Sequence, residues 1–457
     1  LHYPLRRQRQ MCIRDRTVTA SSRLLYQRRP MFPAKAKRVI FIFMAGGPSH
    51  VDSYDYKPDL IRNHDKDYDF TGVRFGTFGK KSKRKLMKPL WDFKRYGQCG
   101  QHVSEVFPYT ALMVDEVCFI KSMHTEGVAH GPSTLFLHTG ATNLIRPSVG
   151  SWITYGLGAE NQNLPAFVTL QPSSSKGGPR NYSNAFLPAI YQGTAIGKAG
   201  QPTSKAKLRN LENNSLSLEE QERRFNLLQD LNSVHLADRP KDDQLDAVVE
   251  SFELAWRMQM NAPKSFELAG ESEATKRLYG IGEKHTDDFG KQCLMARRMA
   301  ESGVRFIQVN YADESTNPRW DQHSNMPKHM DHAKATDKPV AGLLTDLKNR
   351  GLLDETLVWW GGEFGRTPFS QSGDGRDHNP RGFTTWLAGA GIRPGISYGE
   401  TDELGDTAVQ NKVHMHDLHA TILHILGLDH EKLTYRYAGR DFRLTDVHGS
   451  VVRDILS

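Results

Sequence analysis

Acid and imidazole side chains gather in one polar loop of this 457-residue sequence, between two short apolar runs. The segment runs from Leu357 to Gly391, and its loop contains Glu363, Arg366, Asp377 and His378. Side chains of these types at the end of a strand can bind a metal ion or transfer a proton. A purely structural Gly/Asp-rich turn is the competing interpretation, because such loops are common in large α/β proteins.

Three further groups of polar residues each follow an apolar run. Ser49, His50 and Asp52 follow 39–45, then His124, Glu126, His130 and Ser133 follow 116–121, and Asp321 and His323 follow 304–309. In an open α/β sheet the carboxyl ends of parallel strands lie along one rim. We therefore expect these groups to meet the loop at Glu363.

Carboxylate and imidazole ligands without a thiolate suit Zn²⁺ or Mn²⁺ and, with fewer histidines, Mg²⁺ or Ca²⁺. For any single histidine a hydrogen-bonded structural role is the simpler explanation. For the whole set we expect a divalent metal ion or an anion, because clustered unpaired acids would repel one another. The expected ligands are Asp52, Asp321, His323, Glu363 and His378. The last four should lie within about 10 Å of each other, as ligands and their supporting groups must.

The elements that would position these residues are buried strands alternating with helices. Apolar runs predict strands at 39–45, 116–121, 164–170, 304–309, 357–360 and 383–388. Helical patterns appear at 132–140, 245–260, 289–302, 338–349 and 416–426. The alternation predicts an α/β fold with a large, mostly parallel, doubly wound sheet flanked by helices.

The region from about 199 to 285 is polar and helical, and it is predicted to be an inserted helical subdomain. Ser217 and Glu220 form a capping box, and a second helical pattern stops at Pro263. The rest of 35–457 is predicted to be a single α/β domain.

The first 34 residues have no helical or strand period, and we expect a disordered or artefactual basic arm that packs against nothing. Residues 1–38 hold eleven Lys/Arg and one acid, which gives this segment a net charge of about +10. Because the whole chain has a formal charge of +8, the remaining residues carry about −2. A nearly neutral body gives no electrostatic sign of nucleic-acid binding. No run approaches the roughly 20 apolar residues of a membrane helix. The four scattered cysteines show no CxxC spacing, and we expect buried thiols, although Cys99 in its Gly-rich loop could be exposed.

At these residues the chain resembles an uncharacterised bacterial sulfatase-like family, a domain of unknown function numbered fifteen-oh-one. The similar blocks are AKRVIFIFMAGGPSHVDSYDYKP, SMHTEGVAHGPSTLFLHTG, RPSVGSWITYGLG, CLMARRMAESGVRFIQV, WDQHSN, GGEFGRTP and GRDHNPRGF, within about residues 33–450. The family's place in the alkaline phosphatase superfamily implies a large α/β sheet, two metal ions and a nucleophile that attacks phosphorus or sulfur. It also implies export, although Arg6-Arg7 is not followed by the apolar segment of a signal.

The chain departs from the superfamily pattern at three places. The segment from His130 to Thr134 resembles the sulfatase motif Cys-x-Pro-Ser-Arg, with His130 where the formylglycine-forming cysteine stands. Glu363 resembles the acid of a metal-binding Asp-His-Gly segment that has lost its imidazole. Gly46 stands where the first strand usually has a metal-binding aspartate, so Asp52 or Ser49 would have to substitute.

The predicted function is a metal-dependent hydrolase of phosphate or sulfate esters, acting on a small molecule or a polysaccharide. His130 is the expected catalytic residue, as a metal ligand, general base or transient nucleophile, and Ser49 and Ser133 are rival nucleophiles. The alternative is a catalytically degenerate protein of the same fold that binds a metal or an anion.

Overall fold

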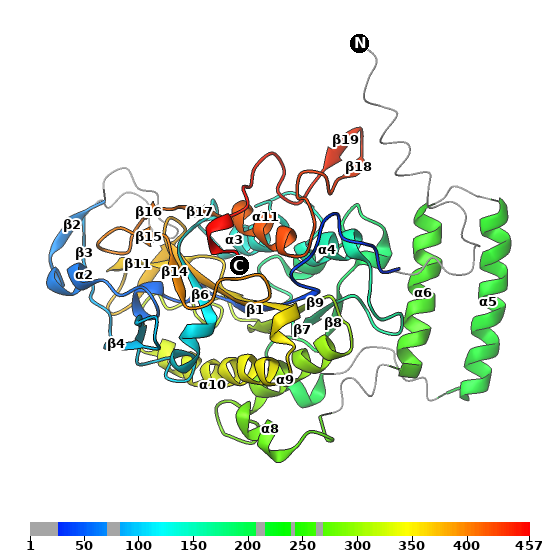
Figure 1. Ribbon diagram of the computed structural model, residues 1–457, viewed down its shortest axis with the longest axis horizontal. Helices are drawn as coiled ribbons and strands as arrows, with labels where there is room; N and C mark the ends of the chain where they lie inside the picture. Colours follow the sequence, from blue (N-terminus) through cyan, green and yellow to red (C-terminus); the bar gives the residue numbers. More distant parts are fainter. Residues whose placement is uncertain (1–25, 71–82, 207–214, 239–242, 262–267) are drawn as a thin grey trace, which may run out of the picture.

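The computed structural model describes residues 26–70, 83–206, 215–238, 243–261 and 268–457 (Figure 1). Its centre is a nine-stranded sheet in the order β14-β6-β13-β10-β1-β9-β7-β8, with β17 paired to β6. The strands are β1 (Arg38–Met44), β6 (Val117–His124), β7 (Phe167–Leu170), β8 (Thr194–Ile196), β9 (Phe306–Tyr311), β10 (Thr356–Gly361), β13 (Phe383–Gly389), β14 (Ile396–Tyr398) and β17 (Val413–His414). All six predicted strands are present.

Helices cover both faces of this sheet. One face packs on α3 (His130–Thr139), α4 (Val149–Leu157) and α11 (Met415–Ile425), and the other on α9 (Asp287–Glu301) and α10 (Lys328–Asn349). Because both faces of β1 are covered, all seven of its residues are buried, which explains its continuous apolar run. The predicted α/β class with a mostly parallel sheet flanked by helices is confirmed.

Helix α10 begins ten residues earlier than the sequence indicated, because Pro339 lies inside it rather than in its first turn. Strand β13 also differs from the expectation, since it runs antiparallel to both of its neighbours, β10 and β6. The amino end of β13, rather than its carboxyl end, therefore lies at the rim where β1, β9 and β10 end. His378 reaches this rim because it precedes β13.

The expected helical insertion contains α5 (Leu218–Asp238), α6 (Asp243–Asn261) and α8 (Glu273–Leu278). In Figure 1, α5 and α6 stand as a pair beside the sheet, and Phe225 stacks on Trp256 with ring centroids 5.2 Å apart. The remaining helix α2 (Pro58–Arg62) and five ribbons lie outside the main sheet. The ribbons are β2 (Asp67–Asp69) with β3 (Lys83–Lys85), β4 (Phe93–Tyr96) with β5 (Gln101–Ser104), β11 (Gly365–Ser370) with β12 (Arg376–Asn379), β15 (Glu400–Thr401) with β16 (Ala408–Gln410), and β18 (Tyr435–Tyr437) with β19 (Arg440–Phe442).

The expectation that residues 1–34 pack against nothing is wrong for the part that the structure describes. The Arg28 backbone N–H donates to the Leu157 carbonyl at 2.7 Å, and the Met31 N–H donates to that of Gly427 at 2.8 Å. Because these bonds join the segment to the ends of α4 and α11, residues 28–31 belong to the domain. Residues 1–25 lie outside the described ranges.

Within the described ranges no helix is both long enough and apolar enough to cross a bilayer. Among the described cysteines, Cys118 and Cys293 are buried and Cys99 is exposed.

Helix α11 supports the carboxyl end of α3. The His419 Nε2–H donates to the Leu137 carbonyl at 2.9 Å, and the His416 Nε2–H donates to the Gly140 carbonyl at 3.0 Å. These bonds satisfy carbonyl groups that a helix end leaves without a partner. Burial lowers the pKa of His419 to about 3 and also lowers the pKa of His416.

Because the folded-state pKa of His419 lies below the unfolded value near 6.5, the unfolded chain binds its proton more readily as the pH falls. Above about pH 6.5 His419 is neutral in both states and its titration does not affect stability. Between about pH 6.5 and pH 3 the free energy of unfolding should fall progressively. Urea unfolding at several pH values measures this loss. His419→Gln should flatten the pH dependence, whereas the exposed control His64→Gln should leave it unchanged; equal slopes in all three proteins would contradict this account.

Candidate metal centre

Four side chains from three separate segments meet at the rim of the sheet. They are His130 at the start of α3, Asp321 and His323 in the loop after β9, and His378 on β12. Their ligand atoms all lie within 4.8 Å of one another, and this is the one such group of imidazole, thiol and carboxyl side chains in the described part of the chain. All but His323 are buried.

Asp321 is at the centre of the group. Its Oδ2 lies 3.0 Å from His130 Nε2, and its Oδ1 lies 2.8 Å from His323 Nε2 and 3.2 Å from His378 Nε2. The Arg366 guanidinium donates to the same Oδ1 at 2.7 Å. Three imidazoles therefore direct the same ring nitrogen at one carboxylate.

The second nitrogen of each imidazole fixes this orientation. Nδ1 of His130 lies 2.6 Å from Glu363 Oε1, and Nδ1 of His378 lies 3.0 Å from the Val128 carbonyl. Nδ1 of His323 faces Gln371 Oε1. All three partners are oxygen acceptors, so hydrogen on each Nδ1 would leave the three Nε2 lone pairs free to bind a metal ion.

Glu363 therefore orients His130 instead of joining the group itself. It follows β10, where its two oxygens accept the Gly46 N–H at 3.0 and 3.2 Å. Carboxylates that fix the tautomer of a ligating histidine in this way are common around metal ions.

The β11–β12 ribbon delivers two of the groups around Asp321. Arg366 and His378 are paired across it, so both side chains enter the site from one rigid element. Arg366 is completely buried and also donates to the Gly47 carbonyl at 3.0 Å.

The pKa values follow from burial and these contacts. Burial opposes ionisation of Asp321, but Arg366 and the three imidazoles hold its pKa far below the ordinary value. Burial would lower the pKa of His130, yet the neighbouring carboxylates of Asp321 and Glu363 raise it. Burial lowers the pKa of His378 to about 4. Asp321 is thus ionised at neutral pH, whereas His378 is neutral.

These residues fit a divalent metal ion. When hydrogen is on Nδ1, three Nε2 lone pairs and a carboxylate face one another, and they repel unless a positive charge lies between them. His130 Nε2 is buried and has no aligned hydrogen bond, although Asp321 Oδ2 is only 3.0 Å away. Three imidazole nitrogens and one carboxylate oxygen suit Zn²⁺ or Mn²⁺ better than Mg²⁺ or Ca²⁺, which prefer oxygen ligands.

The structure brings together five of the predicted site residues, His130, Asp321, His323, His378 and the adjacent Glu363, and it places the other three elsewhere. Asp52, an expected ligand, pairs instead with Arg376 at 2.7 Å, because β12 directs that guanidinium at its carboxylate. Ser49 Oγ donates to Asp52 at 2.5 Å, and Ser133 Oγ donates to the Ala129 carbonyl at 2.8 Å. Both serines are fully buried.

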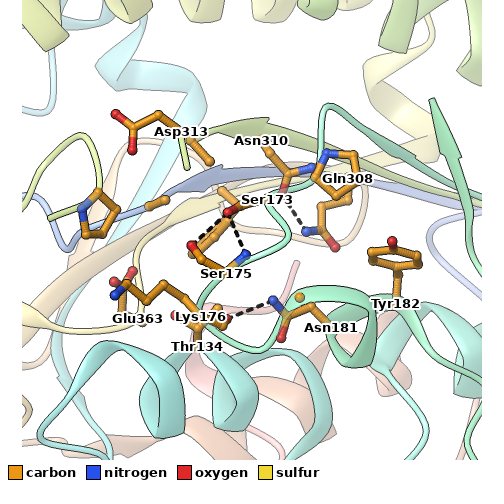
Figure 2. A pocket seen from close by; sticks show the side chains of 16 residues that line it. Thr134, Ser173, Ser175, Lys176, Asn181, Tyr182, Gln308, Asn310, Asp313 and Glu363 are labelled. Carbon is orange, nitrogen blue, oxygen red and sulfur yellow. Dashed lines mark hydrogen bonds between the residues drawn. The ribbon is translucent and has the colours of Figure 1, made fainter. Parts of the chain in front are cut away.

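A recess opens beside Glu363, lined also by Thr134 of α3, Gln308 of β9 and Lys176 in the loop after β7 (Figure 2). Lys176 has a left-handed backbone with φ 50°, which costs a residue with a Cβ about 1 kcal/mol. Asn181 Nδ2 holds this turn by donating to the Lys176 carbonyl at 3.1 Å. Lys176 has no ion pair with any other residue in the described ranges.

Sequence reasoning missed this lysine, although a signal was present. The run at 164–170 was recognised as a strand, and Lys176-Gly177-Gly178 comes shortly after its carboxyl end. Extending the rule on strand ends to this loop would have placed Lys176 at the rim.

Several solved structures are similar to this chain. The lipoteichoic acid synthase LtaP from Listeria monocytogenes is 8% identical with a TM-score of 0.38, covering 92% of this chain and 78% of that one. A mutant TAB5 alkaline phosphatase with bound Mg is 12% identical, with a TM-score of 0.36 and coverage of 87% and 99%. The PsFucS1 sulfatase from Pseudoalteromonas sp. is 11% identical, with a TM-score of 0.35 and coverage of 88% and 68%.

At these scores the function must be argued from the chain's own residues. No curated protein matches the sequence. A family model does match, over residues 36–456. The chain belongs to the family described as "Protein of unknown function (DUF1501)".

Proposed function

We propose that this protein is a metal-dependent hydrolase of phosphate or sulfate esters. The observation that carries the proposal is the convergence of three imidazole Nε2 atoms on the ionised Asp321 carboxylate, all within 4.8 Å. A metal ion held there would supply Lewis-acid polarisation of the ester oxygen. Such an arrangement at the rim of an α/β sheet, beside an open recess, is typical of a reaction centre.

The recess supports an anionic substrate with a polar alcohol group. Lys176 contributes a positive charge without an ion pair to a described residue, and Gln308 and Thr134 add amide and hydroxyl groups, while the carboxylates of Asp313 and Glu363 line the same recess. The Gln308 side chain is fixed by donating to Asn310 Oδ1 at 2.7 Å. We assign the ester group to the side of the metal centre and its alcohol to the recess.

Water is the attacking group that fits the contacts best. The hydroxyl hydrogens of Ser49 and Ser133 already bond to Asp52 and to a helix carbonyl, and neither side chain is exposed. His130 acts in this scheme as a metal ligand whose orientation is fixed by Glu363.

The second candidate is the catalytically degenerate protein that binds a metal or an anion. It is favoured by the pairing of Asp52 with Arg376, which removes an expected ligand, and by Arg366 against Asp321. Turnover of an ester distinguishes the two, because only the hydrolase converts a substrate.

Removal of metal should abolish hydrolysis. Protein treated with a chelator and then dialysed is expected to be inactive on aryl phosphates and aryl sulfates, and Zn²⁺ or Mn²⁺ should restore one of these activities because either ion fits the ligands. Release of the chromophore measures the rate. Metal binding without turnover of any ester would favour the degenerate protein, and absence of metal binding would refute the hydrolase and leave the second candidate only as an anion-binding protein.

His130→Ala should lower kcat by roughly 10²- to 10⁴-fold while the fold is retained, the usual cost of losing a positioned catalytic group. Stopped assays with the restored ion measure kcat, and circular dichroism checks the fold. His64→Ala, at an exposed histidine, is the matched control. Full activity of His130→Ala, or a covalent adduct trapped on Ser49 or Ser133, would overturn this role.

Lys176→Met should raise KM about 10-fold with a smaller effect on kcat, because a charged hydrogen bond to the substrate contributes about 1.5 kcal/mol. Methionine keeps the length of the side chain and removes its charge. Lys198→Met, outside the residues that line the recess, is the control. Equal KM values in the two variants would show that Lys176 does not meet the substrate.

A further inference from the structure

Not every acidic side chain around the rim is free to bind a metal ion. Asp52 accepts hydrogen bonds on both oxygens, from Arg376 Nε at 2.7 Å and from the Leu90 backbone N–H at 3.1 Å. Glu363 is occupied by Gly46 and His130. Among the described carboxylates, Asp321 is the one that joins the three imidazoles within 4.8 Å, so the geometry supplies a ligand set for one ion.

Arg366 lies on the other side of Asp321, at the end of β1. Its guanidinium donates to the carbonyl oxygens of Gly46 and Gly47 and to Asp321 Oδ1. Two backbone carbonyls and a carboxylate are ligands that a hard cation would take. A fixed, permanently charged guanidinium therefore lies where these oxygens could otherwise hold a second ion.

Position 46 cannot supply the ligand that a second ion would need. Gly46 has φ 110°, and a Cβ there would lie 2.7 Å from the backbone nitrogens of Trp320 and Asp321. An aspartate at this position would therefore require both a strained backbone and movement of the Asp321 loop. The close approach of β1 to this loop brings the Gly46 carbonyl to Arg366 instead.

We infer that this chain binds a single divalent ion, between His130, Asp321, His323 and His378, and that Arg366 supplies the second positive charge of the site. The inference rests on the proposed metal centre and specifies it further. It differs from the two ions that the resemblance to the alkaline phosphatase superfamily implies. In this arrangement Arg366 positions the Asp321 carboxylate, with one oxygen shared between the guanidinium and the imidazoles.

Zn²⁺ titration of chelator-treated full-length protein tests the stoichiometry without an activity assay. Native mass spectrometry should show one Zn²⁺ per chain, and calorimetry should show one transition. Two tightly bound ions would overturn the single-ion inference and leave the metal centre intact. No bound ion would refute the metal centre and the inference together.

Two matched variants locate the ion. Asp321→Asn should weaken Zn²⁺ binding by roughly 100-fold or more, since loss of a supporting group alone costs 10- to 100-fold. Asp52→Asn should keep the stoichiometry at one, because Asp52 contacts Arg376 and is not a ligand. Loss of an ion from Asp52→Asn protein that retains its circular dichroism would contradict the assignment.

Arg366→Lys provides a third readout. The lysine keeps a positive charge but cannot reproduce the donors that Arg366 directs at Gly46, Gly47 and Asp321. One Zn²⁺ should still bind, with roughly 10- to 100-fold lower affinity, the cost of losing a group that orients a ligand. Unchanged affinity would show that the guanidinium does not position Asp321.

Discussion

The buried negative charge of Asp321 is the constraint on which the rest of the site depends. A carboxylate that is 5% exposed is stable only when positive charge or hydrogen-bond donors surround it. Arg366 donates to Oδ1, and the three imidazoles bring Nε2 atoms to the same carboxylate, with free lone pairs when hydrogen is on Nδ1. A divalent ion is the partner that satisfies both the carboxylate and the lone pairs.

The fold provides this arrangement through short connections at one rim. Parallel strands β1, β9 and β10 bring Gly46, Asp321 and Glu363 to the same edge, and the antiparallel strand β13 is preceded by the ribbon that carries Arg366 and His378. Helix α3 adds His130 at its first residue. Helix α11 hydrogen-bonds to the carboxyl end of α3. It therefore helps to hold the helix that carries His130 at its amino end.

Much of this could be predicted from the sequence, because apolar runs mark strands and polar residues follow them. The rule that parallel strands end at one rim accounts for the meeting of Asp321, His323 and Glu363, whereas His378 reaches the rim because it precedes the antiparallel strand β13. The role of Asp52 could not be predicted, because the contact with Arg376 joins residues 324 positions apart through a ribbon with no strong pattern. The length of α10 was missed because Pro339 normally marks a helix start. Lys176 was not predicted, because a single lysine after a strand does not belong to a group of acids and imidazoles.

The central claim is that His130, Asp321, His323 and His378 bind one metal ion through three Nε2 atoms and a carboxylate oxygen. Anomalous diffraction at the zinc edge, from crystals of the Zn²⁺-loaded protein, tests it most directly. The account predicts one peak about 2.0–2.2 Å from all four ligand atoms. A peak at Asp52, or no peak at this rim in protein shown to hold zinc, would contradict it.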